Sequence, residues 1–215
     1  MKDYLRQLLA GQRINLDEGQ IDLLEKHYQL VLKWNSATSL TTITSPKDAA
    51  LLHYFESIFA STFVFSAATS LVDIGSGAGF PGVPMAIALP KIQVTVVDSD
   101  RKKVEFLKEC RRRLGLKNLH VVRSRFQDLE QSYEVYTCRA IEKFRQRVEQ
   151  ILELASQAEQ VMLFLSTDAA KSISSERLAK RIQAVPYCRN RAILLLEKHQ
   201  DVPRGTEGVA QECST

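Results

Sequence analysis

A short glycine-rich segment is the part of this sequence best suited to hold a nucleotide-like ligand. It reads VDIGSGAGFPG over residues 72–82 and places Asp73 ahead of three alternating glycines, Gly75, Gly77 and Gly79. Glycine permits a positive φ angle in a tight turn, and its missing Cβ lets a ligand approach the backbone closely. The segment therefore predicts a β-strand that ends in a ligand-binding turn.

A second carboxylate, that of Asp98, follows the next run of β-forming residues. At the end of a strand, such a carboxylate accepts hydrogen bonds from both ribose hydroxyls of an adenine nucleoside. In an open α/β sheet the ligand binds at the carboxyl ends of the strands, where Gly75, Asp98 and Arg139 are expected to lie. Together these residues predict a nucleoside site.

Two classes of cofactor fit the glycine segment, since Gly77, Gly79 and Gly82 also satisfy the GxGxxG pattern of nicotinamide enzymes. The surroundings favour S-adenosylmethionine over NAD. The alternating glycines begin directly after the strand that carries Asp73, and Pro81 lacks an amide hydrogen that a pyrophosphate would use. The rest of the chain also offers no second catalytic domain of the size that most dehydrogenases need. We therefore predict S-adenosylmethionine as the cofactor, with NAD as the weaker alternative.

Alternation of strand-like and helical patterns predicts the fold class. Short β-rich runs occupy residues 71–74, 94–97, 119–122, 135–138 and 161–165, with helical segments between them. This order is typical of βαβ units in a mostly parallel, twisted sheet that is covered on both faces. Two further apolar runs, 184–188 and 192–196, predict an antiparallel hairpin at the edge of the sheet. We expect an α/β, Rossmann-like fold of the class I methyltransferase type.

Capping residues predict helices ahead of the sheet. Residues 17–35 have helical periodicity, with Asp17 as the cap and Gln20 at the capping-box position. Ser45 followed by Pro46 predicts the start of another helix. We therefore expect three parts: an N-terminal helical extension at residues 1–66, an S-adenosylmethionine-binding methyltransferase domain at 67–199, and a disordered tail at 200–215.

Composition excludes several classes of site. No window approaches the roughly 20 apolar residues needed to cross a bilayer, and charges interrupt the first apolar positions, so we expect a cytoplasmic protein with no membrane partner. The cysteines lie far apart without metal-ligand spacing, and we expect no metal site. They are Cys110, Cys138, Cys188 and Cys213. For Cys138 a structural thiol is favoured over a catalytic thiolate, because the motif that such a nucleophile needs is missing.

Positive charge is concentrated in one part of the chain. The net charge is +4. Residues 101–125 contain ten Lys or Arg but only two acidic residues, Glu105 and Glu109. Such a density suits the phosphate backbone of a nucleic acid, because each neutralised phosphate releases counterions. A solvated helix face is the alternative.

Many positions beyond the glycine segment resemble one known family, the ribosomal RNA small-subunit methyltransferase G family, also called glucose-inhibited division protein B. The GxGFPGxP string within residues 73–84 is far more specific than a bare glycine loop. The other matching positions are Lys33-Trp34-Asn35, Leu40-Thr41, His53, Ser57-Ile58, Asp98-Ser99, Lys102-Lys103, Phe106-Leu107, Ser124-Arg125 and Arg139-Ala140. The resemblance implies methylation of a guanine N7 in small-subunit (16S) ribosomal RNA, with that RNA or a ribosomal particle as the partner.

Roles for individual residues follow from the same resemblance. It implies that Gly75 and Phe80 contact the cofactor, that Phe126 and Gln127 flank the adenine, and that Arg139 reaches the methionine end. Independently of the resemblance, we expect Arg125, Arg139 and Arg191 to position the RNA, with surface salt bridges as the alternative for Arg125 and Arg191. The sequence departs from the family's pattern at Gln127, where Glu is usual, at Glu56, where Asp is common, and at Ser166-Thr167, which replaces a Lys-Gly pair.

The chemistry expected here needs no acid or base, because guanine N7 carries a free lone pair at neutral pH. Alignment of the reacting atoms and exclusion of water would then be the main catalytic contributions. His53 and Trp34 are interpreted as packed residues. The alternative for His53 is a catalytic base or an RNA contact, and for Trp34 it is a platform on which an RNA base stacks. Two other functions fit the same sequence: a small-molecule methyltransferase and a non-catalytic RNA-binding assembly factor.

Overall fold

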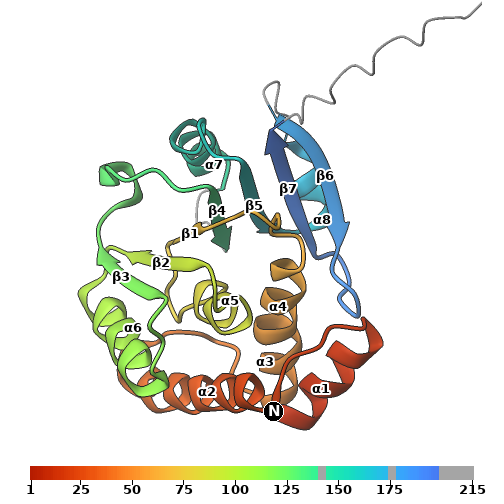
Figure 1. Cartoon of the computed structure of the whole chain (residues 1–215), viewed down its shortest axis with the longest axis vertical. Coiled ribbons are helices and arrows are strands. Elements are labelled where there is room, and N and C mark those ends of the chain that lie inside the picture. The colour runs from red at the N-terminus through yellow and green to blue at the C-terminus, as the bar shows by residue number, and fades with distance from the viewer. Residues whose placement is uncertain (140–143, 174–177, 199–215) are drawn as a thin grey trace, which may run out of the picture.

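The computed structural model describes residues 1–139, 144–173 and 178–198. Ala140 and the tail expected at residues 200–215 lie outside this part. The described residues form one seven-stranded sheet with helices on both faces (Figure 1). Its strand order is β3-β2-β1-β4-β5-β7-β6, in which the first five strands are parallel and β7 runs antiparallel to both neighbours. The predicted fold class is confirmed.

Each predicted parallel strand is present to within one residue at either end. Their apolar runs fit a sheet that is buried on both faces. The strands are β1 (Ser70–Ile74), β2 (Gln93–Asp98), β3 (Leu119–Arg123), β4 (Val135–Arg139) and β5 (Gln160–Leu165).

The crossover helices divide between the two faces of the sheet. On one face, α5 (Gly82–Ala88) and α6 (Arg101–Leu114) connect β1 to β2 and β2 to β3. On the other lie α7 (Phe144–Leu154) and α8 (Thr167–Ser172). Right-handed crossovers that depart from β1 in opposite directions produce this division. A crevice therefore opens where β1 meets β4, at the carboxyl ends of the strands.

Five helical segments precede the sheet. They are α1 (Lys2–Gly11), α2 (Glu18–Thr38), α3 (Pro46–Ala49), the π-helical segment η1 (Ala50–Phe55) and α4 (Glu56–Ser61). The predicted caps are confirmed: Asp17 and Gln20 form a capping box, and the Ser45 side chain accepts a bond from the Asp48 amide. The π-helical segment and α1 were not predicted.

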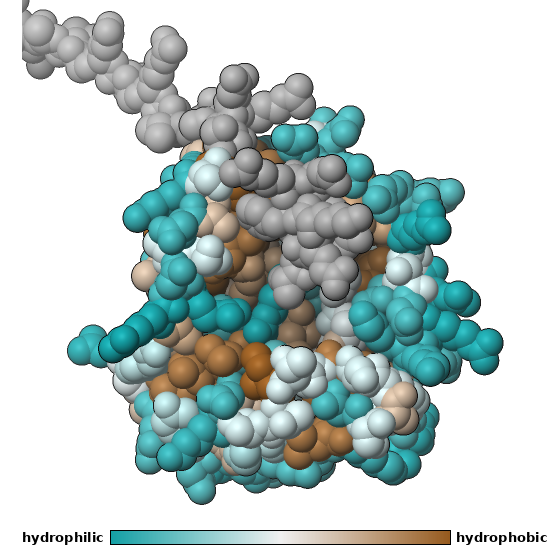
Figure 2. Space-filling model, turned by 180° about the vertical axis from the view of Figure 1, so that it is seen from behind, coloured by the Kyte–Doolittle hydropathy of each residue, from teal (hydrophilic) through white to brown (hydrophobic). Residues whose placement is uncertain are grey.

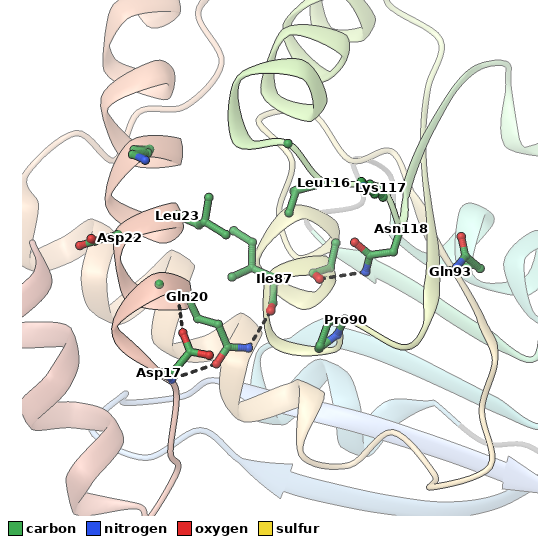
Figure 3. A pocket seen from close by; sticks show the side chains of 14 residues that line it. Asp17, Gln20, Asp22, Leu23, Ile87, Pro90, Gln93, Leu116, Lys117 and Asn118 are labelled. Atoms are coloured by element: carbon green, nitrogen blue, oxygen red, sulfur yellow. Dashed lines mark hydrogen bonds between the residues drawn. The ribbon is translucent and has the colours of Figure 1, made fainter.

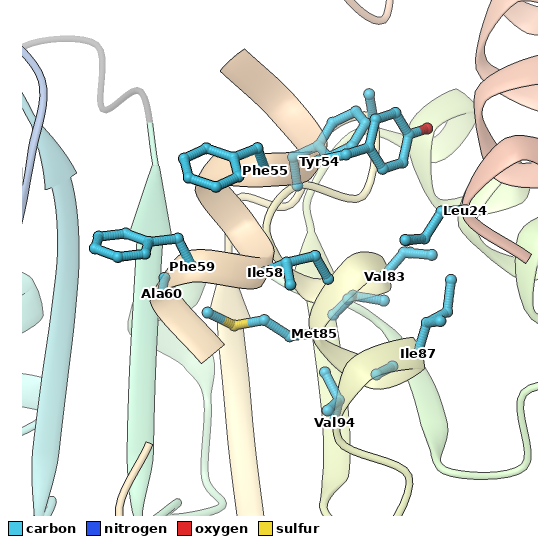
Figure 4. Close-up of a cluster of buried hydrophobic side chains, with 14 of the residues drawn as sticks. Leu24, Tyr54, Phe55, Ile58, Phe59, Ala60, Val83, Met85, Ile87 and Val94 are labelled. Carbon is cyan, nitrogen blue, oxygen red and sulfur yellow. The ribbon is translucent and has the colours of Figure 1, made fainter. Parts of the chain in front are cut away.

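One hydrophobic cluster joins these helices to the sheet (Figure 4). Leu24 of α2 points toward Val83 of α5, while Ile58 of α4 lies over Met85 and Val94 extends from β2. The Leu24, Ile58, Val83, Met85 and Val94 side chains are at most 1% exposed. The apolar packing therefore continues across the expected boundary between residues 66 and 67.

Alternation along β1 determines where its carboxylate points. Leu71 belongs to the cluster under α5, whereas Val72 and Ile74 belong to the opposite cluster under α7 and α8. Because side chains alternate along a strand, Asp73 lies on the α5 face with Leu71. The start of α5 and Asp73 are thereby brought together.

The hairpin at the sheet edge is present, but the position predicted for its first strand is wrong. The strands are β6 (Leu178–Ala184) and β7 (Ala192–Lys198), so residues 185–188 belong to the connecting turn. Pro186 cannot donate a ladder hydrogen bond. At the sheet edge, β6 has a largely polar pattern and lacks the apolar run that identified the other strands.

The described helices are each too short or too polar to cross a membrane. Seen from behind, hydrophilic side chains cover the flanks of the molecule, and hydrophobic ones show in its middle (Figure 2). This distribution is that of a chain whose helices turn their apolar sides toward the sheet.

We predict that Leu24→Ala lowers the free energy of unfolding of the whole chain by about 2–5 kcal/mol, because it opens a cavity in the shared cluster. Chemical denaturation followed by circular dichroism measures this. Lys33→Ala on the exposed side of the same helix is the control, expected to stay within about 0.5 kcal/mol of the unsubstituted chain. A first transition at lower denaturant concentration, in which only part of the helical signal is lost, would contradict a shared core.

Candidate functional site

The glycine turn after β1 adopts a backbone that few other residues could follow. Gly75, Gly77 and Gly79 have φ angles of +70°, +55° and +85°. The amides of Gly75 and Ser76 both donate to the carbonyl of Val97, at 2.9 and 3.0 Å. A Cβ placed on Gly75 would meet no atom within 4 Å. The turn is thus held against β2 while open space remains beside Gly75.

Asp98 faces this turn, as its predicted role requires. One carboxylate oxygen accepts the Gly77 amide at 2.9 Å and the other accepts the Asp100 amide at 2.9 Å. A carboxylate has about four acceptor positions, so two remain for a ligand. Asp98 is only 7% exposed, and these two amides fix its orientation. It is a preformed acceptor at the end of β2.

Asp73 supports the turn from beneath instead of lining the cavity. It is fully buried and accepts the Gly82 amide at 3.0 Å and the Thr137 hydroxyl at 3.3 Å. Burial raises the pKa of Asp73 to about 6, against the opposing effect of these hydrogen bonds. Its carboxylate therefore joins the glycine turn to the first residue of α5.

A cavity of about 570 Å³ lies at the carboxyl ends of β1, β2 and β4. Of the predicted site residues it contains Gly75, Asp98, Arg125, Phe126, Gln127 and Arg139. The remaining lining residues are Ile74, Val97, Ser99, Lys103, Ser124, Cys138 and Ile151. Residues far apart in the chain thus meet at the predicted edge of the sheet.

Gly79 and Phe80 lie away from the cavity lining, in an aromatic cluster. The Phe80 ring stacks on His53 at 4.2 Å between ring centroids and lies 5.1 Å from His27 and from Tyr54. A Cβ on Gly79 would come within 2.7 Å of Val83 and 3.2 Å of His27. The N-terminal helices therefore support the far side of the glycine turn.

Two arginines converge on one buried carboxylate, that of Glu56. Arg191 donates to both of its oxygens at 2.8 Å, and an Arg139 nitrogen lies 3.4 Å from one of them. Arg139 also donates to the carbonyl of Leu52 at 2.6 Å. Its other terminal nitrogen, Nη1, is buried without a hydrogen-bond partner among the described residues. The group carries a net positive charge.

Other residues singled out from the sequence have structural contacts. His53 is 7% exposed, and its Nε2 lies 3.0 Å from the Thr41 hydroxyl. Trp34 makes an edge-to-face contact with Phe106 of α6, at 5.8 Å between ring centroids. The Cys138 thiol donates to the carbonyl of Ile74 at 3.3 Å. Each contact fits the packed or structural interpretation.

The predicted site residues left out several contributors, among them Glu56, Lys103 and Ile151. Glu56 was noted only as a departure from the family's pattern, and nothing local marks it as the partner of two arginines. Lys103 and Ile151 line the cavity from α6 and α7. Of these, only Lys103 could have been found from the sequence, because it follows Asp98 at the end of β2 by five residues.

A second, larger cavity of about 770 Å³ lies between the start of α2, the end of α5 and the turn before β3 (Figure 3). There Gln20 donates to the carbonyl of Ile87 at 2.8 Å. Asn118 donates to the carbonyls of Ala86, Leu89 and Ile92. These polar groups bond to the fold itself. Within the described residues, no group of three or more His, Cys, Asp or Glu could hold a metal ion.

Comparison with known proteins identifies the family. The family model described as rRNA small subunit methyltransferase G matches residues 20–190. The chain belongs to this family. The protein of that name from Staphylococcus epidermidis strain ATCC 12228 is 32% identical over 186 residues, covering 84% of this chain and 78% of its own. The one from Streptococcus sanguinis is 29% identical and covers 92% of this chain and 91% of its own.

Solved structures confirm the methyltransferase fold. A magnesium protoporphyrin IX methyltransferase from Synechocystis, solved with S-adenosylmethionine bound, has a TM-score of 0.56 at 14% identity and covers 86% of this chain and 98% of its own. An rRNA methylase from Streptococcus thermophilus has a TM-score of 0.51 at 13% identity, and the match covers 67% of this chain and 95% of the methylase. At such identities the likeness concerns the fold alone.

Acid is expected to weaken the support beneath the glycine turn. Burial lowers the pKa of His27 to about 3, far below the 6.5 of an exposed imidazole. The unfolded chain therefore binds a proton at His27 at a pH where the folded chain does not, and stability falls as the pH drops below about 6.5.

We predict that between about pH 7 and pH 4.5 this residue alone costs roughly 2–3 kcal/mol of unfolding free energy. The Tyr54 hydroxyl lies 3.0 Å from Nδ1 of His27. His27→Asn keeps an amide that can bond to this hydroxyl and does not titrate, so the stability of this variant should change less over that range. Urea denaturation of both chains at the two pH values provides the measurement. Equal changes in the two chains would show that His27 is not the buried neutral group described.

Proposed function

We propose that this protein transfers the methyl group of S-adenosylmethionine to N7 of a guanine in small-subunit ribosomal RNA. The observation that carries the proposal is the preformed Asp98 carboxylate, held by the Gly77 amide at the edge of a cavity and beside an open glycine turn. Membership of the rRNA small subunit methyltransferase G family supplies the substrate class. The cellular location that fits such a substrate is the cytoplasm.

The residues at the cavity fit the adenosine part of the cofactor. Asp98 would accept the ribose hydroxyls with its two remaining acceptor positions. The space beside Gly75, which a Cβ would enter, admits the sugar close to the backbone. Phe126 would pack on the adenine face, and Gln127 would bond to its edge. Asp73, Gly77, Gly79 and Phe80 would act by holding the turn in this shape.

Arg139 fits the methionine end. Its buried Nη1 lacks a protein partner among the described residues, and a buried donor of this kind is costly unless a ligand satisfies it. Burial lowers the pKa of Arg139, but the normal pKa of a guanidinium is so high that the group stays charged. The α-carboxylate of the methionine moiety is an anion that would satisfy both the charge and the free nitrogen.

When bound, S-adenosylmethionine supplies an electrophilic methyl group on its sulfonium centre. Guanine N7 has a lone pair, so no residue of this chain has to remove a proton before transfer. The task of the chain is to hold both reactants in line and to exclude water. The described cavity lining, which holds no paired acid and base at its centre, suits this chemistry.

Two alternatives from other functional classes lead to different observations. A small-molecule methyltransferase would use the same cavity but would give no role to the basic residues of α6. A non-catalytic RNA-binding assembly factor would have no need of an intact cofactor site, whereas Asp98 and the glycine turn are in place here.

The decisive experiment is transfer of labelled methyl to small-subunit ribosomal RNA from cells that lack this protein, followed by nucleoside analysis. We expect the label in 7-methylguanosine. Label in any other nucleoside would refute the substrate assignment. Failure to bind S-adenosylhomocysteine in a calorimeter would refute both enzymatic functions.

Asp98→Asn should weaken S-adenosylhomocysteine binding by at least roughly tenfold, because it replaces charge-assisted hydrogen bonds with neutral ones. Asp100→Asn removes the same charge two residues away, where the side chain caps α6 and does not line the cavity. The affinity of the Asp100→Asn variant for S-adenosylhomocysteine should stay near that of the unsubstituted chain. Calorimetric titration of all three chains makes the comparison, and equal losses in both variants would exclude a specific ribose contact.

Arg139→Gln tests the placement of the methionine end. It should weaken S-adenosylhomocysteine, which carries the α-carboxylate, by roughly tenfold or more, and leave methylthioadenosine, which lacks it, almost unaffected. Competition between the two ligands in one binding assay gives the ratio. If the ratio does not change, Arg139 contacts something other than the cofactor carboxylate.

A further inference from the structure

Eight of the ten cations of the basic segment, all except Arg111 and Lys117, fall into two groups that differ in their ionic partners. Lys108, Arg112 and Arg113 are paired with glutamates of their own helix: Lys108 lies 2.9 Å from Glu105, and both arginines lie 2.8 Å from Glu109. These pairs neutralise much of the charge in the second half of α6.

The other group includes two residues that line the cavity, Lys103 and Arg125. It consists of Arg101, Lys102 and Lys103 in the first turn of α6 and of Arg123 and Arg125 at the end of β3. Within residues 1–139, 144–173 and 178–198, none of these five cations forms an ion pair. Four of them are exposed, and Lys103 is half-buried in the cavity lining together with Arg125.

The placement of this group is unfavourable for the isolated helix. Cations in a first turn face the positive end of the helix dipole, whereas cations in a last turn, such as Arg111, are stabilised by the dipole. Asp100, which caps the Lys102 and Lys103 amides at 2.8 and 3.1 Å, offsets this only in part, because one carboxylate stands against three cations. Helix stability therefore does not account for three successive cations at this end, and an anionic partner would.

The edge strand β3 carries the second part of this group and lies beside β2, which leads into α6. β3 is the outermost strand beside β2, and Arg123 is paired in register with Asp98. Its guanidinium extends toward the loop before α6 and donates to the Ser99 carbonyl at 3.5 Å. Figure 1 shows α6 and β3 side by side at the same end of the molecule. Lys103 and Arg125 thus line the cavity, and Arg101, Lys102 and Arg123 stand next to them in the sequence of α6 and β3.

We infer that the sugar-phosphate backbone of the RNA substrate crosses the first turn of α6 and the end of β3, with its phosphates on Arg101, Lys102, Lys103, Arg123 and Arg125. This inference rests on the proposed function and assigns it a docking face. The partner is a polyanion with closely spaced charges, which several unpaired cations in a row bind through counterion release. The paired cations farther along α6 take little part.

Two triple variants with the same change in charge test this assignment. R101Q/K102Q/R123Q removes unpaired cations that do not line the cavity, and K108Q/R112Q/R113Q removes paired ones from the same helix. The probes are a fluorescein-labelled single-stranded RNA of about 20 nucleotides and deproteinised small-subunit ribosomal RNA. Affinity is measured over a range of monovalent salt concentrations.

For R101Q/K102Q/R123Q we expect RNA binding at least roughly tenfold weaker at about 0.1 M salt, and a salt dependence reduced by about 2 in log-log slope. For K108Q/R112Q/R113Q we expect a change of less than about threefold, since paired surface cations contribute little. S-adenosylhomocysteine should bind both variants as it binds the unsubstituted chain. Equal weakening in both variants, or none in the first, would overturn the docking face.

The same series distinguishes failure of this inference from failure of the proposed function. If the unsubstituted chain binds S-adenosylhomocysteine and methylates ribosomal RNA while both variants behave alike, only the docking face is wrong. If the unsubstituted chain methylates no RNA, the proposed function is wrong, and the docking face fails with it.

Discussion

The hydrogen bond from the Gly77 amide to the Asp98 carboxylate is the contact on which the geometry of the site depends. It joins the turn after β1 to the end of β2. On the other side of the turn, Asp73 holds the first amide of α5. Hydrogen bonds to charged groups contribute about 1.5–3 kcal/mol each, enough to keep a glycine-rich loop in one conformation. Glycine supplies the backbone angles, and the two carboxylates remove the freedom that glycine would otherwise leave.

Support for this loop comes from outside the sheet. Phe80 stacks on His53 and lies near His27, so two N-terminal helical segments pack directly against the loop. Both histidines are kept neutral, because burial lowers their pKa values to about 3 and about 2. The N-terminal helices therefore support the site directly, and they share one hydrophobic cluster with the sheet.

How much the sequence reveals depends on how local the signal is. The parallel strands, the helix caps at Asp17 and Ser45 and the glycine turn follow from spacing within a few residues, and these were predicted. The edge strand β6 was misplaced because an edge buries little and therefore lacks an apolar run. Helix α1 was missed although Leu5, Leu8 and Leu9 have helical spacing. Glu56 could not be predicted at all, since its role depends on two arginines that only the fold brings near.

The ion pair between Glu56 and Arg191 also sets the order in which the site can be completed. These two residues are 135 positions apart, and the later one lies in the turn that follows β6. During synthesis the glycine turn and its supporting helices emerge early, but the second cation on Glu56 arrives only when most of the chain has been translated. A nascent chain would thus expose a carboxylate with an incomplete set of partners. The ionic group beside Arg139 is therefore completed only by the hairpin at the edge of the sheet.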